Sequence, residues 1–363
     1  MADPVGTINF DQLSHITRKH YIPQLVDNIF KSNVVTYRLL AKSQPVSGGY
    51  KVVQPVEYAK SASSTGAAQN GWYKGQDEMA YGASDIIKSA EYDWSQAYGT
   101  VTISAREENI NSGPEAVLDL LQAKLNNIGR VMRDDFAKAI YSDNDPASSG
   151  TPTVSANAPV GLQHVTSNGR ILGGIDSSSN TWWNPGFDKN MGDFGGTSGT
   201  SISFDDLKDS SNAGYIQTIF RNAYKELSIG ADVPSMIVCS QIVFDAYEST
   251  LTDQKRFGAS SQTLADAGFQ NLLYRGIPVV VDQALDLYDG DGSDEATDAK
   301  RQIFFLNEKY MGYKHHSKRN FVFDGYEKPV DRDIRVGKIL WMGALCFSSP
   351  RMLGRMGDMP IAY

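Results

Sequence analysis

Residues 112–141, SGPEAVLDLLQAKLNNIGRVMRDDFAKAIY, form the stretch around which the chain is organised. Apolar side chains recur along it in steps of three or four residues, which places them on one face of an α-helix. The members of this stripe are Val117, Leu121, Leu125, Ile128, Met132, Phe136 and Ile140. Ser112 followed by Glu115 is typical of a capping box, and Pro114 suits the first helical turn. The pattern predicts one helix of roughly 40 Å, a strut that other elements cross.

The composition is that of an ordinary globular protein: 363 residues, of which 41% are hydrophobic and 21% charged. A chain of this length usually divides into two or three domains. It has no run approaching about 20 apolar residues, so we expect no membrane partner. The start, MADPVGTINFDQL, lacks the pattern of a secretory signal. Cys239 and Cys346 lie in apolar runs, which indicates buried thiols and a reducing, cytosolic site of synthesis.

The formal net charge is −8 and the pI is about 5.2. This acidic balance argues against a protein that grips nucleic acid phosphates, because such proteins gather Lys and Arg on the binding face. It is compatible with a shell that encloses DNA without binding it strongly.

Two kinds of segment precede the long helix. Within residues 1–47, YIPQLVDNIFKSNVVTYRLL indicates a short amphipathic helix ending near 31–33, in an arm that lies along another surface. Residues 48–104 contain two strand-like runs, YKVVQPVEYA and a second from Asp85 to Ile103, joined by a Gly- and Ser-rich tip over 61–82. An isolated two-stranded hairpin is marginal in water. We therefore expect it to pack on its own domain or on another subunit.

The second half of the chain has an α/β pattern. A helix is predicted from Tyr215 to Gly230, a buried strand at SMIVC and a second helix over 241–251. The very apolar runs VVVDQAL and IFFLN indicate further strands. Three more strands are expected between 320 and 348, at NFVFDGYE, DIRVGKI and LWMGALCFSS.

No pattern of reactive side chains indicates an enzyme. The acidic loop 286–298 offers Asp289, Asp291 and Asp294 as weak cation ligands, but it lacks the spacing of an EF-hand and more simply forms a solvated hairpin. His315 and His316 are adjacent, so both rings do not readily face one metal ion. Nucleophile elbow, P-loop and dinucleotide fingerprint are all missing from the sequence. We therefore expect neither catalysis nor a cofactor.

The order of these segments resembles that of the major capsid proteins of tailed bacteriophages with the HK97-type fold. The carrying segments are the arm TINFDQLSHITRKHYIPQLVDNIF, the hairpin between Gly48 and Ser104, the capped helix, GGIDSSSNTWWNP, and the series PSMIVCSQIVFDAY, LLYRGIPVVVDQAL and RQIFFLN. Each motif alone is weak, and the order carries the resemblance.

The resemblance implies an α+β, HK97-like capsid fold in four parts. These are an N-terminal arm at 1–47, an extended β-hairpin loop at 48–104, a peripheral domain at 105–200 and 300–345 with the spine helix 113–141, and an α/β axial domain at 201–299 and 346–363. The implied function is self-assembly, as pentamers and hexamers, into an icosahedral shell that encloses double-stranded DNA without sequence-specific binding. The location would be the virion capsid, assembled in the host bacterial cytoplasm.

The resemblance also implies partners and contact residues. A separate scaffolding protein and a portal are expected, with room for a decoration protein. The candidates for assembly interfaces are Ile29, Phe30, Tyr58, Trp72, Tyr73, Lys74, Trp94, Trp182 and Trp183. Some relatives crosslink a loop Lys to an Asn of a neighbour. Lys60 and Lys74 lie in this loop, but no acid-lined pocket is evident in the sequence, so no crosslink is predicted.

Three alternatives stay open on the sequence. The nearest is an encapsulin-type compartment, in which the same fold would hold a protein cargo. The Gly/Ser-rich insertions and the GGID…WW segment favour the viral shell. A secreted adhesive β-rich protein would fit the Gly/Ser/Tyr-rich loops, but the capped helix and the missing signal weigh against it. A hydrolase would need an acid–base or metal site that the sequence does not display.

Overall fold

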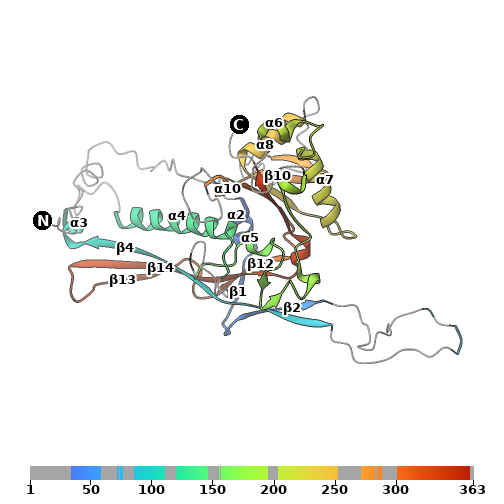
Figure 1. Cartoon of the computed structure of the whole chain (residues 1–363). Helices are drawn as coiled ribbons and strands as arrows, with labels where there is room; N and C mark the ends of the chain where they lie inside the picture. Colours follow the sequence, from blue (N-terminus) through green and yellow to red (C-terminus); the bar gives the residue numbers. More distant parts are fainter. Residues whose placement is uncertain are drawn as a thin grey trace.

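The computed structural model describes residues 34–58, 72, 74–76, 86–110, 120–145, 155, 157–194, 203–251, 271–282, 284–287 and 301–359 (Figure 1). Its helices are α2 Val34–Ala41, α3 Ala105–Ile110, α4 Leu120–Tyr141, α5 Leu162–Val165, α6 Phe204–Lys208, α7 Ile216–Leu227, α8 Gln241–Thr250 and α10 Ala284–Leu287, with the 3-10 turns η1 Thr181–Trp183, η2 Met191–Phe194 and η4 Pro350–Met352. Its strands are β1 Gln44–Val46, β2 Val52–Glu57, β3 Ile87–Tyr92, β4 Ser95–Ser104, β5 Ile171–Leu172, β6 Ile175–Asp176, β7 Phe187–Asn190, β8 Met236–Cys239, β9 Asn271–Tyr274, β10 Ile277–Val281, β11 Arg301–Leu306, β12 Met311–His316, β13 Val322–Glu327, β14 Ile334–Phe347 and β15 Gly354–Met359. No helix in this part of the chain is both long and apolar enough to cross a bilayer.

A five-stranded sheet forms the elongated end of the molecule. Its order is β1-β12-β14-β13, and β4 also pairs with β14, antiparallel, from Ser95 to Ser104. The prediction of separate strands at DIRVGKI and LWMGALCFSS is wrong, because β14 is one strand of 14 residues. After three exposed or half-buried residues, its middle part alternates between buried and half-buried residues, and its last five residues are all buried. The apolar pattern therefore changes along β14 without a turn.

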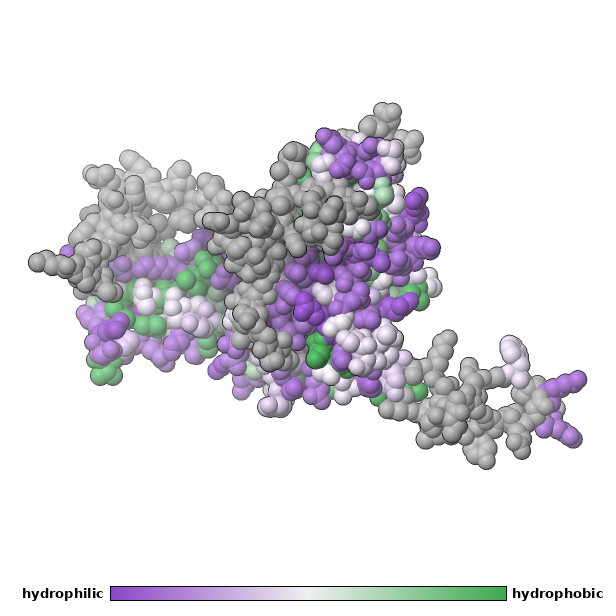
Figure 2. All heavy atoms as spheres, viewed as in Figure 1, coloured by the Kyte–Doolittle hydropathy of each residue, from purple (hydrophilic) through white to green (hydrophobic). Residues whose placement is uncertain are grey.

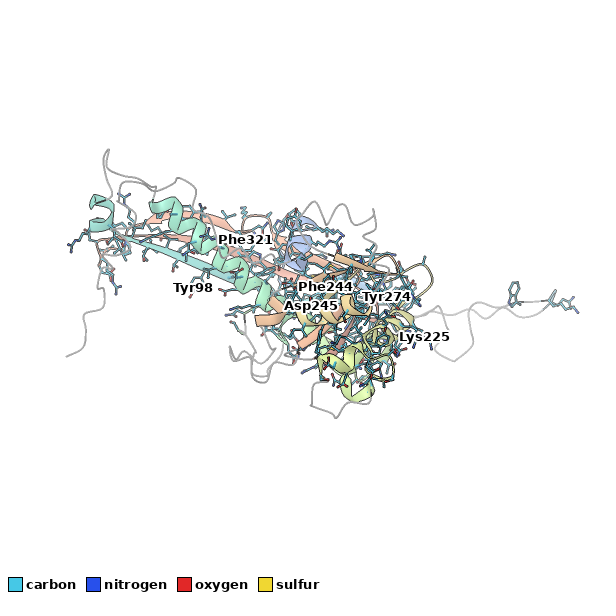
Figure 3. The ribbon with its side chains drawn as sticks, turned by 90° about the horizontal axis from the view of Figure 1, so that it is seen from above. Tyr98, Lys225, Phe244, Asp245, Tyr274 and Phe321 are labelled. Atoms are coloured by element: carbon cyan, nitrogen blue, oxygen red, sulfur yellow. The ribbon has the colours of Figure 1, made fainter. Side chains whose placement is uncertain are left out.

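The long helix α4 lies lengthwise over this sheet, as seen from above in Figure 3. Met132, Phe136 and Ile140 are buried, and Ile128 packs against the same core. The Phe136 ring meets three other aromatic rings, with centroid distances of 5.0 Å to Trp341, 5.8 Å to Tyr313 and 6.5 Å to Phe321. The apolar stripe from Ile128 to Ile140 is thus the contact between helix and sheet. Val117 and the predicted cap at Ser112, Pro114 and Glu115 lie outside the described residues, as do the side chains of Leu121 and Leu125.

Two glycines at this helix–sheet contact give opposite predictions. A Cβ at Gly99 of β4 would lie 2.3 Å from Ile128 Cγ2 and 2.7 Å from Met132 Sδ, whereas a Cβ at Gly129 of α4 meets nothing within 4 Å. We expect Gly99→Ala to lower the free energy of unfolding by about 1–3 kcal/mol, because the β-branched Ile128 cannot easily move away. Gly129→Ala should raise it by up to about 1 kcal/mol through helix propensity. Urea unfolding of both variants checks the pair, and equal effects would contradict the close approach of α4 to β4.

The second sheet has six strands in the order β7-β15-β11-β8-β10-β9. The helix α7 covers it with the predicted stripe, which consists of Ile216, Ile219, Phe220, Ala223 and Leu227, all buried. The predictions of a buried strand at SMIVC and of the helix that follows are confirmed by β8 and α8. Cys239 and Cys346 are both buried thiols, as predicted.

The six-stranded sheet takes strands from several ranges of the expected division of the chain. β7 lies within 105–200 and β11 within 300–345, ranges expected to be peripheral, yet both belong to the six-stranded sheet. β7 pairs with β15 in parallel, and β11 pairs with β8 and β15 in antiparallel fashion. Strand pairing joins segments distant in sequence, so neither assignment could be made from local pattern.

The run from Asp85 to Ile103, predicted as one strand, is divided between two sheets. β3 pairs with β2 to form the stem of a hairpin, and β4 continues after Asp93–Trp94 into the five-stranded sheet. The stem projects from the body in the direction opposite to the far end of β13 and β14 (Figure 1). The amphipathic helix expected before residue 33 lies outside the described residues.

A buried carboxylate joins three parts of the fold. Asp282, which is fully buried after β10, accepts a hydrogen bond of 2.7 Å from the Tyr141 hydroxyl at the end of α4. It also accepts from the backbone N–H of Ala284 at 3.0 Å and from the N–H groups of Val34 and Val35 at the start of α2. The carboxylate therefore caps α2 and ties it to both α4 and the six-stranded sheet.

Candidate assembly surfaces

The hairpin stem has one face packed on its own chain and one face exposed. Val52, Val56, Ala90 and Tyr92 are buried, and the Tyr92 hydroxyl donates to the Phe347 carbonyl oxygen at 2.8 Å. Burial raises the pKa of the Tyr92 hydroxyl well above its usual range, so it stays a donor.

The opposite face of the stem carries apolar side chains without cover from this chain. Val53 is 52% exposed and Ile87 is 61% exposed. Alternation of residues along paired strands places these two side chains on the same side of the stem. Exposed apolar residues on a two-stranded stem are typical of a surface that another protein covers.

The segment 161–183, which we call the saddle, packs against the stem. It begins at Gly161, whose N–H donates to the Asn144 carbonyl oxygen at 2.8 Å, just after α4. At its β5–β6 turn, Gly173 has φ +59° and accepts a hydrogen bond of 2.9 Å from the Glu91 N–H of β3. A Cβ at Gly173 would lie 2.9 Å from the Ala90 Cβ, so the turn and the stem are in direct contact.

An aromatic and cationic cluster closes the contact between saddle and stem. The rings of Tyr58 and Trp182 stack with centroids 5.2 Å apart. The Lys88 ammonium lies 5.2 Å from the Tyr58 centroid and 6.0 Å from that of Trp182, and it donates to Asn180 Oδ1 at 3.1 Å. A cation over aromatic rings contributes about 0.5–1 kcal/mol at exposed sites. The cluster thus fixes the direction in which the hairpin leaves the body.

The two tryptophans of the saddle have different places. Trp182 is half-buried in the cluster with Tyr58. Trp183 is 2% exposed, and its Nε1 donates to the Leu172 carbonyl oxygen at 3.0 Å. The expectation that Trp183 lies at an assembly interface is therefore wrong, because this ring fills the core under the saddle. Two adjacent residues of a 3-10 turn point in different directions, which the sequence alone did not distinguish.

An open cleft of about 430 Å³ lies beside this cluster. It is lined by Pro55, Val56, Glu57, Tyr58, Trp182, Trp183, Tyr310, Ser348, Ser349 and Arg351. Its walls combine the stem, the saddle, the turn at η4 and Tyr310 from the connection between β11 and β12, so the cleft exists only where these segments meet.

The remaining expected contact residues are spread over the hairpin and its base. Trp72 is fully exposed, and Lys74 is exposed beside it in sequence. Trp94 is half-buried, and its Nε1 donates to the Gly49 carbonyl oxygen at 2.9 Å. The other candidates, Ile29, Phe30 and Tyr73, lie outside the described residues, and so do the acidic residues Asp289, Asp291 and Asp294.

The contact residues expected from the sequence did not include a row of exposed side chains on the five-stranded sheet. The strand register places Tyr98 of β4 opposite Leu340 of β14, and Leu340 opposite Val322 of β13. Tyr98 is 75% exposed and Val322 is 45% exposed, and both lie on the face of the sheet opposite to α4. We call Tyr98, Leu340 and Val322 the outer row. Figure 2, in the same view as Figure 1, shows green apolar patches among purple hydrophilic ones at this end of the molecule, around α4 and the strands next to it. The alternation of Tyr98 with Val101 and Ile103, both buried, is a signal that could have revealed the outward face of β4.

The described residues contain no group of three or more His, Cys, Asp or Glu side chains placed to hold a metal ion. His315 and His316 are neighbours on β12, and burial lowers the pKa of His315 below its usual range. The features of the described residues that stand out are therefore exposed surfaces, on the hairpin stem and in the outer row.

Comparison with known proteins relates the fold to solved shells. No protein-family model matches the chain, and no curated protein sequence matches it. Solved structures do: the capsid of the native GTA particle (13% identity, TM-score 0.54, 94% of this chain and 96% of that one) and the cyanophage A-1(L) capsid (13%, 0.55, 94% and 97%). The SrpI encapsulin of Synechococcus elongatus is also similar (12%, 0.51, 99% and 98%). At identities this low, the structural likeness shows a shared fold and nothing finer. The likeness extends over nearly the whole of each chain.

Proposed function

From the HK97-type capsid fold of this chain, as the resemblance predicted, we propose that it is the structural subunit of a closed protein shell of the tailed-bacteriophage type. The observation that carries the proposal is the hairpin, whose stem packs on its own chain by one face and leaves Val53 and Ile87 exposed on the other. The role is structural rather than enzymatic.

The arrangement of the two exposed surfaces supports contacts between copies. The hairpin stem (β2 and β3) and the elongated sheet that bears the outer row lie toward opposite ends of the molecule (Figure 1). One copy cannot lay its hairpin over its own outer row, so the hairpin would lie over the neighbouring subunit. Contacts between unlike patches on successive copies are heterologous, and they close into rings when the rotation allows it. Pentamers and hexamers are such rings.

The parts of the subunit then have distinct roles. The arm at 1–47 and the hairpin within 48–104 would wrap neighbours, and α4 would be the spine of the peripheral domain. We assign the axial role, which builds the centre of each ring, to the six-stranded sheet with α7 and α8, including β7 and β11.

The content of the shell would be double-stranded DNA, held without sequence-specific binding, because the chain is acidic overall. Assembly would take place in the host bacterial cytoplasm and end in the virion capsid. A separate scaffolding protein, a portal and a decoration protein are the partners that this function would add to self-association.

An encapsulin-type compartment is the second candidate, and the likeness to the SrpI encapsulin over 99% of this chain favours it. The two candidates differ in cargo. Particles isolated from an expressing cell should contain nuclease-protected DNA for a virion shell and a protein cargo for a compartment.

Negative-stain micrographs of the expressed protein test the proposal, with a change in each exposed surface. Closed particles are expected for the wild type. Ile87→Asp and Tyr98→Asp should leave the unfolding midpoint nearly unchanged, since both side chains are largely exposed, but should prevent particle formation. Ile229→Asp, at an apolar position 40% exposed outside both surfaces, is the matched control and should still assemble. A wild-type protein that stays monomeric with and without a scaffold would contradict the proposal.

A further inference from the structure

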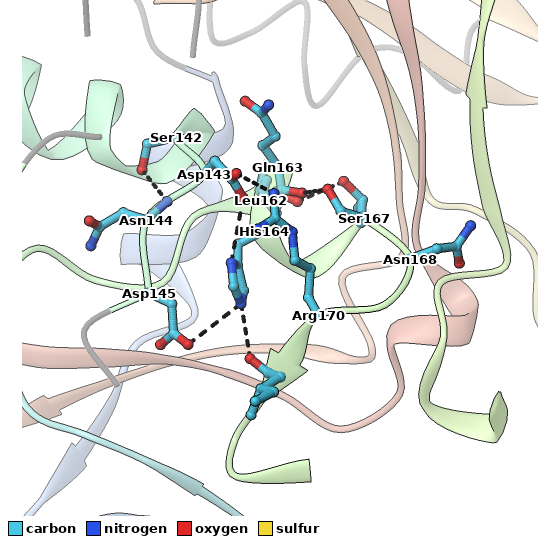
Figure 4. A network of polar contacts seen from close by, with 12 residues as sticks. Ser142, Asp143, Asn144, Asp145, Leu162, Gln163, His164, Ser167, Asn168 and Arg170 are labelled. Carbon is cyan, nitrogen blue, oxygen red and sulfur yellow. Dashed lines mark hydrogen bonds and ion pairs between the residues drawn. The ribbon is translucent and has the colours of Figure 1, made fainter. Parts of the chain in front are cut away.

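A buried histidine lies between the end of α4 and the hairpin stem. His164 of α5 is 5% exposed and sits within the saddle (Figure 4). Asp143 and Asp145, in the segment that follows α4, approach its ring from one side, and Arg170 of the saddle pairs with Asp143 at 2.6 Å. Within the described part of the chain, these are the charged groups that pair with the ring or with its partners.

Both ring nitrogens of His164 face acceptor oxygens. Nδ1 lies 3.4 Å from Asp143 Oδ1, and Nε2 lies 2.9 Å from the Ile171 carbonyl oxygen and 3.5 Å from Asp145 Oδ2. A neutral imidazole has one N–H, so one nitrogen would turn a lone pair toward an oxygen, whereas the imidazolium donates from both. Within the described part of the chain, buried Asp143 Oδ1 has no other hydrogen-bond donor, which strengthens the case for a proton on Nδ1.

The charges beside the ring favour its protonation. His164 and Arg170 then lie close to Asp143 and Asp145, two cations near two carboxylates. Loss of the ring proton removes the attraction between the imidazolium and both carboxylates, of which Asp145 has a side chain only 6% exposed. Because water screens buried charges weakly, that attraction is stronger here than it would be at the surface.

The ring is also linked to the hairpin stem through the saddle. Its Nε2 partner, the Ile171 carbonyl, begins the β5–β6 turn, and that turn holds β3 through the Glu91–Gly173 hydrogen bond. A change in the protonation of His164 would therefore affect the packing at the base of the hairpin as well as at the end of α4.

We propose that His164, Asp143 and Asp145 form a proton-dependent clasp, in which the protonated ring fixes the saddle to the end of α4 and the neutral ring lets saddle and stem loosen. The inference stands on this chain's own contacts and does not depend on what it assembles into.

The direction of the pH dependence follows from the surroundings of the ring. Burial, the largest single influence, lowers the pKa of His164, but the hydrogen bonds that its ring donates to Asp143 and to the Ile171 carbonyl oxygen, together with the two carboxylate charges, raise it above its usual range. A histidine whose pKa is raised on folding contributes stability that is complete below the unfolded pKa of 6.5 and is lost as the pH rises through the folded pKa.

Hydrogen exchange on the full chain, corrected for the intrinsic pH dependence of exchange, tests the clasp. Between pH 5.5 and 9, protection of the amides in 86–92 and 171–176 should fall by up to about tenfold per unit of pKa difference between the closed and open states, while β8 and α7 keep their protection. His164→Gln should abolish this step. Asp145→Asn should move it to lower pH, because one carboxylate charge is removed. His315→Gln, at the other histidine with a shifted pKa, is the control and should retain the step.

Two results would overturn the proposal: protection that does not change with pH in the wild type, or an unchanged step in His164→Gln. Should His164→Gln fail to fold, proton NMR of wild-type protein labelled at histidine Cε1 provides the second test, with the five resonances assigned from variants of the other four histidines. A His164 resonance that titrates above 6.5 supports the clasp, and one that titrates below 6.5 contradicts it.

Discussion

Phe136→Asp should leave no soluble folded protein, and Phe136→Ala should lower the free energy of unfolding by about 3–5 kcal/mol. The Phe136 side chain is 6% exposed, and it lies where α4 meets the five-stranded sheet. Its ring is in edge contact with Tyr313, Phe321 and Trp341, and the indole N–H of Trp341 donates to the Tyr313 hydroxyl. Truncation would open a cavity among these rings, and a carboxylate there would be buried without a partner.

Guanidinium unfolding followed by tryptophan fluorescence measures the effect of Phe136→Ala. Val131→Ala is the matched control, because Val131 lies on the same helix and is 46% exposed. Its effect should stay within about 0.5 kcal/mol. Similar losses for the two variants would mean that α4 does not rest on the sheet by the stripe that contains Phe136.

Asp282→Ala should cost about 2–4 kcal/mol of unfolding free energy, the second largest effect that we expect. Without the carboxylate, the Tyr141 hydroxyl at 2.7 Å and the first N–H groups of α2 lose their buried acceptor. Tyr141→Phe is the milder comparison and should cost about 1 kcal/mol, since one hydrogen bond is removed and the cap on α2 remains. Equal effects would show that the α2 cap contributes nothing.

The same carboxylate predicts a pH dependence. Burial is the main influence on Asp282, and it raises the pKa of the carboxyl above 3.8 despite the hydrogen bonds from Tyr141, Ala284, Val35 and Val34. The folded state therefore binds this proton more tightly than the unfolded state, and the resulting stabilisation is largest below 3.8 and declines as the pH rises through the folded pKa. Asp282→Asn should remove this decline, seen as a smaller fall in the unfolding free energy above pH 4. An unchanged profile would assign the decline to other groups.

Local periodicity predicted those elements whose apolar residues are buried by their own face. The stripe of α7, the buried strand β8 and the part of α4 from Ile128 to Ile140 follow from spacing alone, because a helix or strand presents its side chains with a fixed period. The stem of the hairpin was also predictable, from β-branched runs around a Gly-rich tip. The order of these segments was enough to indicate the capsid fold.

The candidate surfaces were only partly predictable. Tyr58 and Trp182 were expected contact residues, and the structure brings them together with Lys88, which no local pattern singled out. Trp183 was expected at an interface and is buried instead. The outer row consists of residues from three strands, and one of its pairings, between Tyr98 and Leu340, joins residues far apart in the chain, so the row has no signature in any one segment.

By itself, the sequence determined which segments are helix, strand or projecting loop, and in what order, since these depend on neighbours a few residues away. Only the tertiary structure decided that β7 and β11 belong to the six-stranded sheet, that β14 runs unbroken, and that Asp282 and His164 are buried beside their partners. The physical reason is that strand register and the burial of a polar side chain depend on contacts between residues far apart in the chain, where the energy of a pairing is set by the partner and not by the local pattern.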